Sequence, residues 1–143
     1  NIVILGASAL ATAQHLKALY PQAMIHGLRG RADGAERHYD EFGEHLRTLY
    51  REGQPLLALC AAGIVIRSLA ALLAEKGAEP PVLALAEDGS AVVPLLGGLA
   101  GVNRLAREIA AHLAQVSGID TVAPARARGD STATAVESRS LRR

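Results

Sequence analysis

Features that mark several other protein classes are scarce in this 143-residue chain. Its one cysteine, Cys60, cannot form an internal disulfide, and the sequence shows neither a secretory signal nor a long apolar run. We therefore expect a reducing cytoplasm and no membrane segment. Tryptophan is absent and aromatic residues make up 3% of the chain, which leaves little for base stacking. Because the formal net charge is only +1, we expect no nucleic-acid partner.

What is present suits a layered α/β domain. Half of the residues are hydrophobic, and alanine and branched aliphatic residues supply most of them. This composition fits helices that pack on a sheet. The apolar patterns end near residue 123, so we predict a domain over 1–123 and a flexible tail over 124–143. The chain starts with Asn1 inside a strand pattern rather than with Met, and we expect neighbouring domains in the natural protein.

Hydrophobic periodicity predicts alternating strands and helices. Strands are expected at 2–5, 23–26, 56–60, 82–86 and 91–96, helices at 8–20, 38–52, 64–76 and from 102 onward, a loop at 28–37 and an edge strand at 119–123. Ser8 is the expected N-cap of the first helix, and Asp88-Gly89 predicts a hairpin turn between two antiparallel strands. The fold class is thus a three-layer α/β/α domain, with a mostly parallel sheet and one hairpin strand.

The most informative segment runs from Leu95 through a glycine-rich turn into a helix. Gly97, Gly98 and Gly101 fall within five residues of one another, where an apolar strand meets a helix N-terminus. Exposed backbone N–H groups and the partial positive charge of such a helix end favour an anionic ligand. Close packing of the helix on the sheet is the alternative explanation for these glycines.

Four further residues complete the expected binding site. Asn103 is positioned to cap the last helix, to bind ligand, or to do both. Arg104 lies in the first turn of that helix, where an acidic ligand would offset its unfavourable interaction with the helix dipole. Gly63 and Arg67 follow the strand that ends at Cys60. We expect the turns after Cys60 and after Leu96 to meet at the carboxyl edge of the sheet.

Other motifs are weak. Gly6-Ala7-Ser8 lacks the G-x-G-x-x-G spacing and the acidic residue that dinucleotide binding requires, so no nucleotide cofactor is expected. His38, Glu41 and His45 share a predicted helical face without zinc-protease spacing, so no metal site is predicted. Cys60 is expected to be a buried, inert thiol.

A family resemblance rests on several of these segments taken in order. They are residues 62–67, 72–73, 76, 79–82, 88–89, 93–98 and 103–107. Together they resemble the amino-terminal domain of the cobalt-precorrin-5A hydrolase family of cobalamin biosynthesis, including versions fused to precorrin-3B C17-methyltransferase.

The resemblance implies a corrinoid substrate with many carboxylates, opening of its ring A δ-lactone by water, and release of acetaldehyde. Cobalt would enter only as part of that substrate, and the domain itself would bind no cofactor. Many similar sequences carry His where this chain has Leu99, and a leucine cannot transfer a proton. A non-catalytic binding or partner domain of a corrin methyltransferase therefore stays an open alternative. No catalytic residue is assigned; Glu87 and Asp88 are acid/base candidates by elimination, and Asp88 is better explained by the turn.

Overall fold

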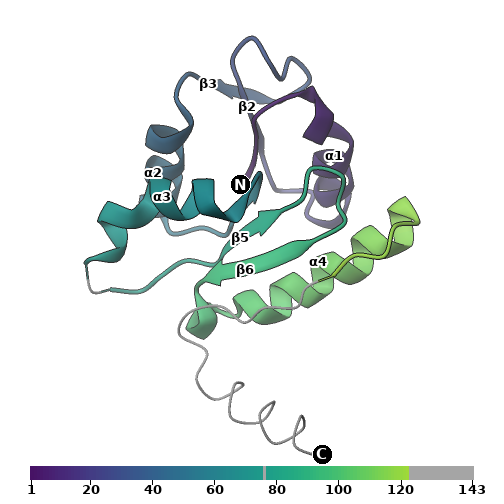
Figure 1. Cartoon of the computed structure of the whole chain (residues 1–143). Helices are drawn as coiled ribbons and strands as arrows, with labels where there is room; N and C mark the ends of the chain where they lie inside the picture. The colour runs from purple at the N-terminus through teal and green to yellow at the C-terminus, as the bar shows by residue number, and fades with distance from the viewer. Residues whose placement is uncertain (76, 123–143) are drawn as a thin grey trace, which may run out of the picture.

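The computed structural model describes residues 1–75 and 77–122 (Figure 1), and the tail predicted at 124–143 lies outside this range. The strands are β1 (Ile2–Ile4), β2 (Ile25–Leu28), β3 (Arg37–Tyr39), β4 (Leu56–Leu59), β5 (Val82–Leu85) and β6 (Val92–Leu96). The helices are α1 (Leu10–Leu19), α2 (Phe42–Glu52), α3 (Ala62–Leu73) and α4 (Val102–Ser117), and two short 3₁₀ turns are η1 (Ala7–Ala9) and η2 (Gly98–Ala100).

The strands of the described residues form one sheet in the order β3-β2-β1-β4-β5-β6. The first five are mutually parallel, and β6 runs antiparallel to β5. From β1 the chain crosses by α1 to β2 on one side, whereas from β4 it crosses by α3 to β5 on the other. The strand order therefore reverses between β1 and β4, and ligands bind at the carboxyl ends of strands at such a switch point.

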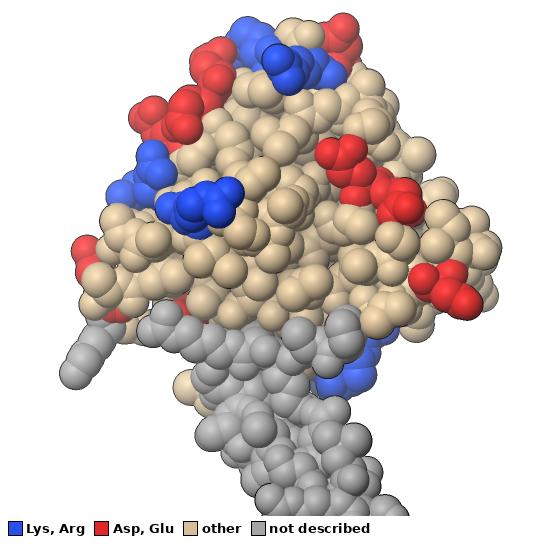
Figure 2. Space-filling model, in the orientation of Figure 1, with Lys and Arg blue, Asp and Glu red and all other residues tan. Residues whose placement is uncertain are grey.

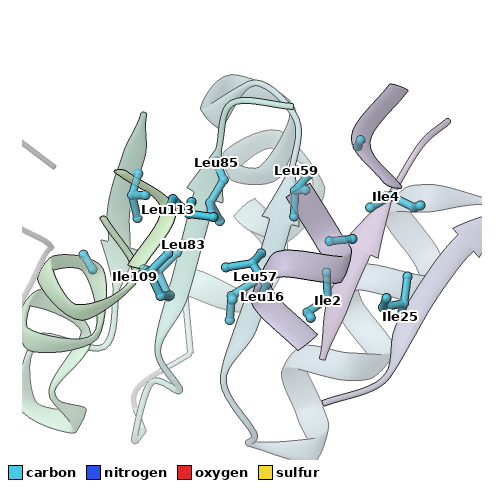
Figure 3. Packing of buried hydrophobic residues seen from close by; sticks show 14 of the residues in the cluster. Ile2, Ile4, Leu16, Ile25, Leu57, Leu59, Leu83, Leu85, Ile109 and Leu113 are labelled. Atoms are coloured by element: carbon cyan, nitrogen blue, oxygen red, sulfur yellow. The ribbon is translucent and has the colours of Figure 1, made fainter. Parts of the chain in front are cut away.

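Two apolar layers hold helices on both faces of the sheet. On one face, Ile2 and Leu83 pack with α1 and α4 side chains such as Leu16 and Ile109 (Figure 3). On the other face, Val3 lies in a second cluster with residues of α2 and α3. The alternation follows from the period-two geometry of strands, in which successive side chains point to opposite faces. The expected α/β/α layering is confirmed. No helix in the described part of the chain is long and apolar enough to cross a bilayer.

Residues 29–36 form the predicted loop, but the helix predicted from His38 starts too early. Arg37–Tyr39 instead forms the edge strand β3, paired in parallel with β2. Tyr39 is buried, and its hydroxyl donates a 2.7 Å hydrogen bond to the carbonyl of Ile4. The helix starts later because the Glu41 carboxylate accepts hydrogen bonds from the amides of Gly43 and Glu44. The helical spacing of apolar residues extends upstream of the observed helix start, because it includes Tyr39, which packs in the sheet.

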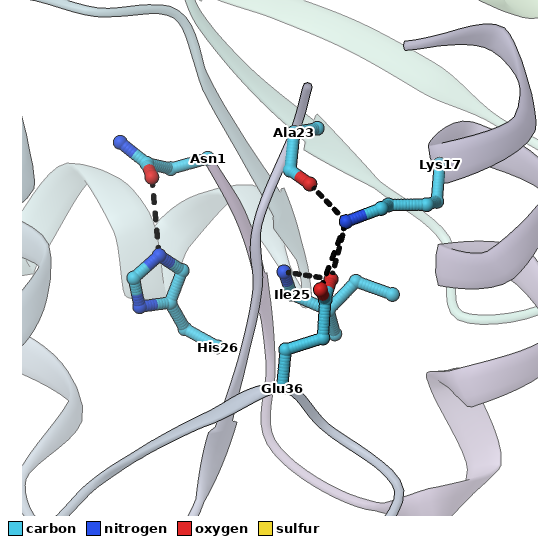
Figure 4. A network of polar contacts seen from close by, with 6 residues as sticks. All are labelled: Asn1, Lys17, Ala23, Ile25, His26 and Glu36. Carbon is cyan, nitrogen blue, oxygen red and sulfur yellow. Dashed lines mark hydrogen bonds and ion pairs between the residues drawn. The ribbon is translucent and has the colours of Figure 1, made fainter. Parts of the chain in front are cut away.

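Three smaller expectations also need correction. Ser8 lies in η1 and makes no capping hydrogen bond. The second strand begins at Ile25, two residues later than predicted. Lys17 donates hydrogen bonds to the carbonyl of Ala23 and to Glu36 at this point (Figure 4). The Glu36 carboxylate also accepts a hydrogen bond from the Ile25 amide. The edge strand predicted at 119–123 is reduced, within the described residues, to a single bridge of Val122 to Ala91.

Candidate functional site at the carboxyl edge of the sheet

The loops that follow β1, β4 and β5 meet at the carboxyl edge of the parallel strands, around the switch point. Hydrogen bonds of Ser8 and Thr12 to Glu87 join the loops after β1 and β5, and an open cavity of about 280 Å³ lies beside the ends of β4 and β5. It is lined by Cys60, Ala61, Ala62, Ala84, Leu85, Ala86, Glu87 and Val93. Most of these side chains are small, and Ala61 and Gly63 in the β4–α3 turn are exposed.

The β4–α3 turn supplies unused hydrogen-bond donors. Ala61 is the N-cap of α3 and provides no side-chain cap. The amides of Ala62 and Gly63 precede the first intrahelical bonds, and the structure gives them no acceptor among residues 1–75 and 77–122. The Arg67 guanidinium folds back over this turn, where its Nη1 would lie 3.2 Å from a β-carbon placed on Gly63. Gly63 and Arg67, two of the residues expected to bind substrate, thus lie side by side in this turn.

Arg67 is also electrostatically available. It is exposed, and no carboxylate in the described part of the chain forms an ion pair with it. The N-terminal end of α3 adds a partial positive charge beside this guanidinium. Charged hydrogen bonds from arginine to carboxylates are stronger than neutral ones and can be bidentate. The turn can therefore bind a carboxylate.

Glu87 brings an acidic group to the same cavity. The Ser8 hydroxyl donates a hydrogen bond to its Oε2, and Thr12 Oγ1 donates a 2.6 Å hydrogen bond to its backbone carbonyl. These bonds join the hairpin after β5 to the β1–α1 connection. Asp88 has a different role, because its Oδ1 accepts from the amide of Ser90 within the turn. The turn explanation for Asp88 is confirmed.

Cys60 lies at the base of the cavity as a protonated thiol. Burial, and next the negative charge of Glu87, raise its pKa to about 11. A thiol is a poor nucleophile until it is deprotonated. The expectation of an inert, buried Cys60 agrees with this environment.

The glycine-rich turn after β6 does not belong to this site, which corrects the expectation that the two turns meet. Leu96 is opposite Val82, at the start of β5, whereas Cys60 follows the end of the parallel neighbour β4. The two turns are at opposite edges of the sheet, separated by about 13 Å of strand. The reason is the hairpin, which reverses the direction of β6.

The local geometry of that turn also accounts for two of its glycines. Gly97 has φ +89° and a β-carbon there would lie 2.6 Å from the carbonyl oxygen of Pro80, so close packing requires glycine. Gly101 has φ +87° and is itself the N-cap of α4, so the capping role expected for Asn103 is wrong. Asn103 is buried within the helix, whereas Arg104 is exposed. Whether Gly98 and these neighbours bind a separate anion stays a prediction.

The contact between Ser8 and Glu87 was not predicted from the sequence. They are 79 positions apart, so no local motif links them. Figure 2 shows an uncharged central area on this side of the molecule, with basic side chains over α3 and acidic ones over the tip of the β5–β6 hairpin. The available signal was that each residue lies in a turn that follows a predicted strand.

Comparison with known proteins identifies the family. The family model described as "Cobalamin synthesis G N-terminal" matches residues 44–123, which is more than half of the chain. The chain belongs to this family. The matched residues include the β4–α3 turn, the hairpin and the glycine-rich turn, which are segments that carried the resemblance to cobalt-precorrin-5A hydrolases.

Two curated relatives carry the name cobalt-precorrin-5A hydrolase. The protein from Priestia megaterium is 25% identical over 119 residues, covering 78% of this chain and 32% of the relative. The protein from Salmonella typhimurium is 31% identical over 105 residues, covering 73% of this chain and 30% of the relative. This cobalamin synthesis G N-terminal domain therefore spans about a third of the length of the relatives that it matches.

A solved structure supports the fold. It is described as a cobalamin biosynthesis protein G homolog from Sulfolobus solfataricus, with a TM-score of 0.52 and 19% identity to this chain. The likeness covers 85% of this chain and 36% of the other. At this level of identity it shows a shared architecture for the cobalamin synthesis G N-terminal domain.

Proposed function

We propose that this domain binds a carboxylate-rich corrinoid precursor at the carboxyl edge of its sheet, as part of a protein that opens the δ-lactone and releases acetaldehyde. The observation that carries the proposal is the turn after β4, where two amides without an acceptor among the described residues lie beside the unpaired Arg67. The relatives named cobalt-precorrin-5A hydrolase supply the substrate class. Cobalt would arrive within the substrate, and the compartment expected from the single cysteine is the reducing cytoplasm.

The substrate and the site are chemically complementary. A corrin ring with acetate and propionate side chains carries several negative charges around a broad apolar macrocycle. The small residues lining the cavity leave room at the β4–α3 turn, and the adjoining surface is largely uncharged (Figure 2). One peripheral carboxylate would be held by Arg67 and the amides of Ala62 and Gly63.

Binding is tested with two matched probes. Isothermal titration would compare cobyrinic acid, which has free carboxylates, with its neutral heptamethyl ester. We expect binding of the acid only, weakened about tenfold by Arg67→Ala, because charged hydrogen bonds contribute about 1.5 kcal/mol or more. Arg51→Ala, which removes an exposed arginine in the last turn of α2, is the matched control and should leave the affinity unchanged. Equal binding of acid and ester, or equal effects of the two substitutions, would contradict the proposal.

Leu99 does not decide between catalysis and a purely binding role. It is 96% exposed in η2, at the amino edge of the parallel strands and away from the cavity beside Glu87. The alternative is a substrate-binding or partner domain of a corrin methyltransferase. Corrinoid binding without lactone opening would support this alternative.

A further inference from the structure

We infer that Glu87 is the general base that activates water for lactone opening, and that Ser8 positions it. The inference rests on the proposed function, because it assigns a residue to the hydrolysis proposed for this site. Three loops far apart in sequence build the arrangement: the β1–α1 connection holds Ser8, the β4–α3 turn faces the cavity, and the hairpin carries Glu87.

The Glu87 carboxylate is held by one oxygen and open at the other. Oε2 accepts the hydrogen bond from Ser8, and no other side chain in the described ranges 1–75 and 77–122 bonds or ion-pairs with this carboxylate. The Thr12 bond to the Glu87 carbonyl fixes the backbone that carries it. Oε1 therefore remains available to a water molecule in the cavity that Glu87 lines.

The neighbouring groups assign the roles by elimination. Cys60 is a protonated thiol at the base of the cavity, and Asp88 is engaged with the Ser90 amide. Arg67 and the amides of Ala62 and Gly63 are donors and are suited to hold substrate carboxylates or the developing oxyanion. Among the cavity-lining residues, only Glu87 combines a proton-accepting side chain with a fixed orientation.

The proposed step balances as an ester hydrolysis. Glu87 takes a proton from water while the water oxygen forms a bond to the lactone carbonyl carbon. The tetrahedral intermediate then breaks its ring C–O bond, and the proton on Glu87 passes to the departing alkoxide. One water is consumed, and a carboxylic acid and an alcohol are formed, with no oxidant or reductant required.

The test measures lactone opening and corrinoid binding on the same preparations. The 143-residue chain and the complete reading frame that contains it would be incubated with the lactone-bearing corrinoid, and the ring-opened carboxylic acid would be quantified by mass spectrometry. Glu87→Gln should lower kcat about 100-fold or more and leave cobyrinic acid binding intact, since a positioned general base contributes about 10²- to 10⁴-fold. Asp88→Asn, one residue away in the same turn, is the control and should retain the rate within about twofold.

Ser8 is tested as a positioning residue. Ser8→Ala should lower kcat about tenfold with KM nearly unchanged, and Ser8→Thr, which keeps the hydroxyl, should restore most of the rate. A structural role would instead change thermal stability and binding together, so circular dichroism melts accompany each variant.

Each outcome distinguishes this inference from the proposed function. If Glu87→Gln hydrolyses at the wild-type rate, the role of Glu87 is overturned and the proposed function stands. If the unaltered proteins bind cobyrinic acid but neither opens the lactone, the base assignment is overturned and only binding survives. If nothing binds, both are overturned.

Discussion

Replacing Gly97 by alanine should destabilise the fold far more than the same change at Gly101. Both glycines have nearly the same left-handed backbone, with φ +89° and +87°. At Gly101 a β-carbon would meet no heavy atom within 4 Å, so the cost is the left-handed conformation alone, about 1–2 kcal/mol. Reduced entropy of the unfolded chain offsets about 0.5 kcal/mol of this. We expect Gly101→Ala to cost about 1 kcal/mol.

At Gly97 the same β-carbon would lie 2.6 Å from the Pro80 carbonyl oxygen and 2.7 Å from the Pro81 α-carbon. These are backbone atoms, and the Pro81 carbonyl accepts a 2.8 Å hydrogen bond from the Leu56 amide, which fixes them to β4. Overpacking against groups that cannot move aside costs a further 1–3 kcal/mol or so. Gly97→Ala should therefore cost about 3 kcal/mol in total.

The assay is urea denaturation followed by far-ultraviolet circular dichroism, with the free energy of unfolding extrapolated to water for both variants. The informative quantity is the difference between the two costs, because the backbone conformation is common to both. If Gly97→Ala costs no more than Gly101→Ala, the close approach of Pro80 and Pro81 does not constrain this turn, and the packing argument is refuted.

Two further predictions concern titratable groups. Burial, then the neighbouring His45, lower the pKa of His26 to about 4 from 6.5, so the folded state binds fewer protons than the unfolded state between these values. The contribution of His26 to the free energy of unfolding should be fully present above pH 6.5 and fall by about 2 kcal/mol as the pH drops toward 4, after allowance for partial solvent screening. Urea denaturation at several pH values measures this dependence. His26→Asn should flatten this dependence, and an equally steep loss in that variant would contradict the assignment. For Cys60, whose pKa is about 11, alkylation by iodoacetamide at pH 8 should be at least tenfold slower than in the urea-unfolded chain, and equal rates would contradict its burial.

Local patterns predicted the interior of this fold well. The strands at β4 and β5 and the helix α4 fall where apolar runs and the i, i+3, i+4 spacing place them. The edge strand β3 was missed because Arg37 and His38 are exposed and only Tyr39 is buried. Such a three-residue strand is specified by pairing with β2 and by the Tyr39 bond to Ile4, and neither contact leaves a periodic signal in the sequence.

The glycine-rich turn after β6 was predicted at the wrong edge of the sheet, although the sequence contains the hairpin signal that places it correctly. Asp88 and Gly89 predict a hairpin, and a hairpin reverses the next strand. Carried to the end of β6, that reversal places Gly97 beside the start of β5, as observed. The contact of Ser8 with Glu87 could not be predicted in this way. It depends on the strand order, in which β1 and β5 lie on either side of β4.

The reversal of β6 assigns different tasks to the two edges of the sheet. At the amino edge, Gly97 packs against Pro80 and Pro81, and this contact fixes where α4 begins. At the carboxyl edge, Ser8, Glu87 and Arg67 are exposed and contribute little burial, so they can be substituted at small cost in stability. Substitutions at Gly97 should therefore change the free energy of unfolding without changing corrinoid affinity in the folded fraction. Substitutions at Arg67 should do the reverse, because the site and the packed turn share no residue.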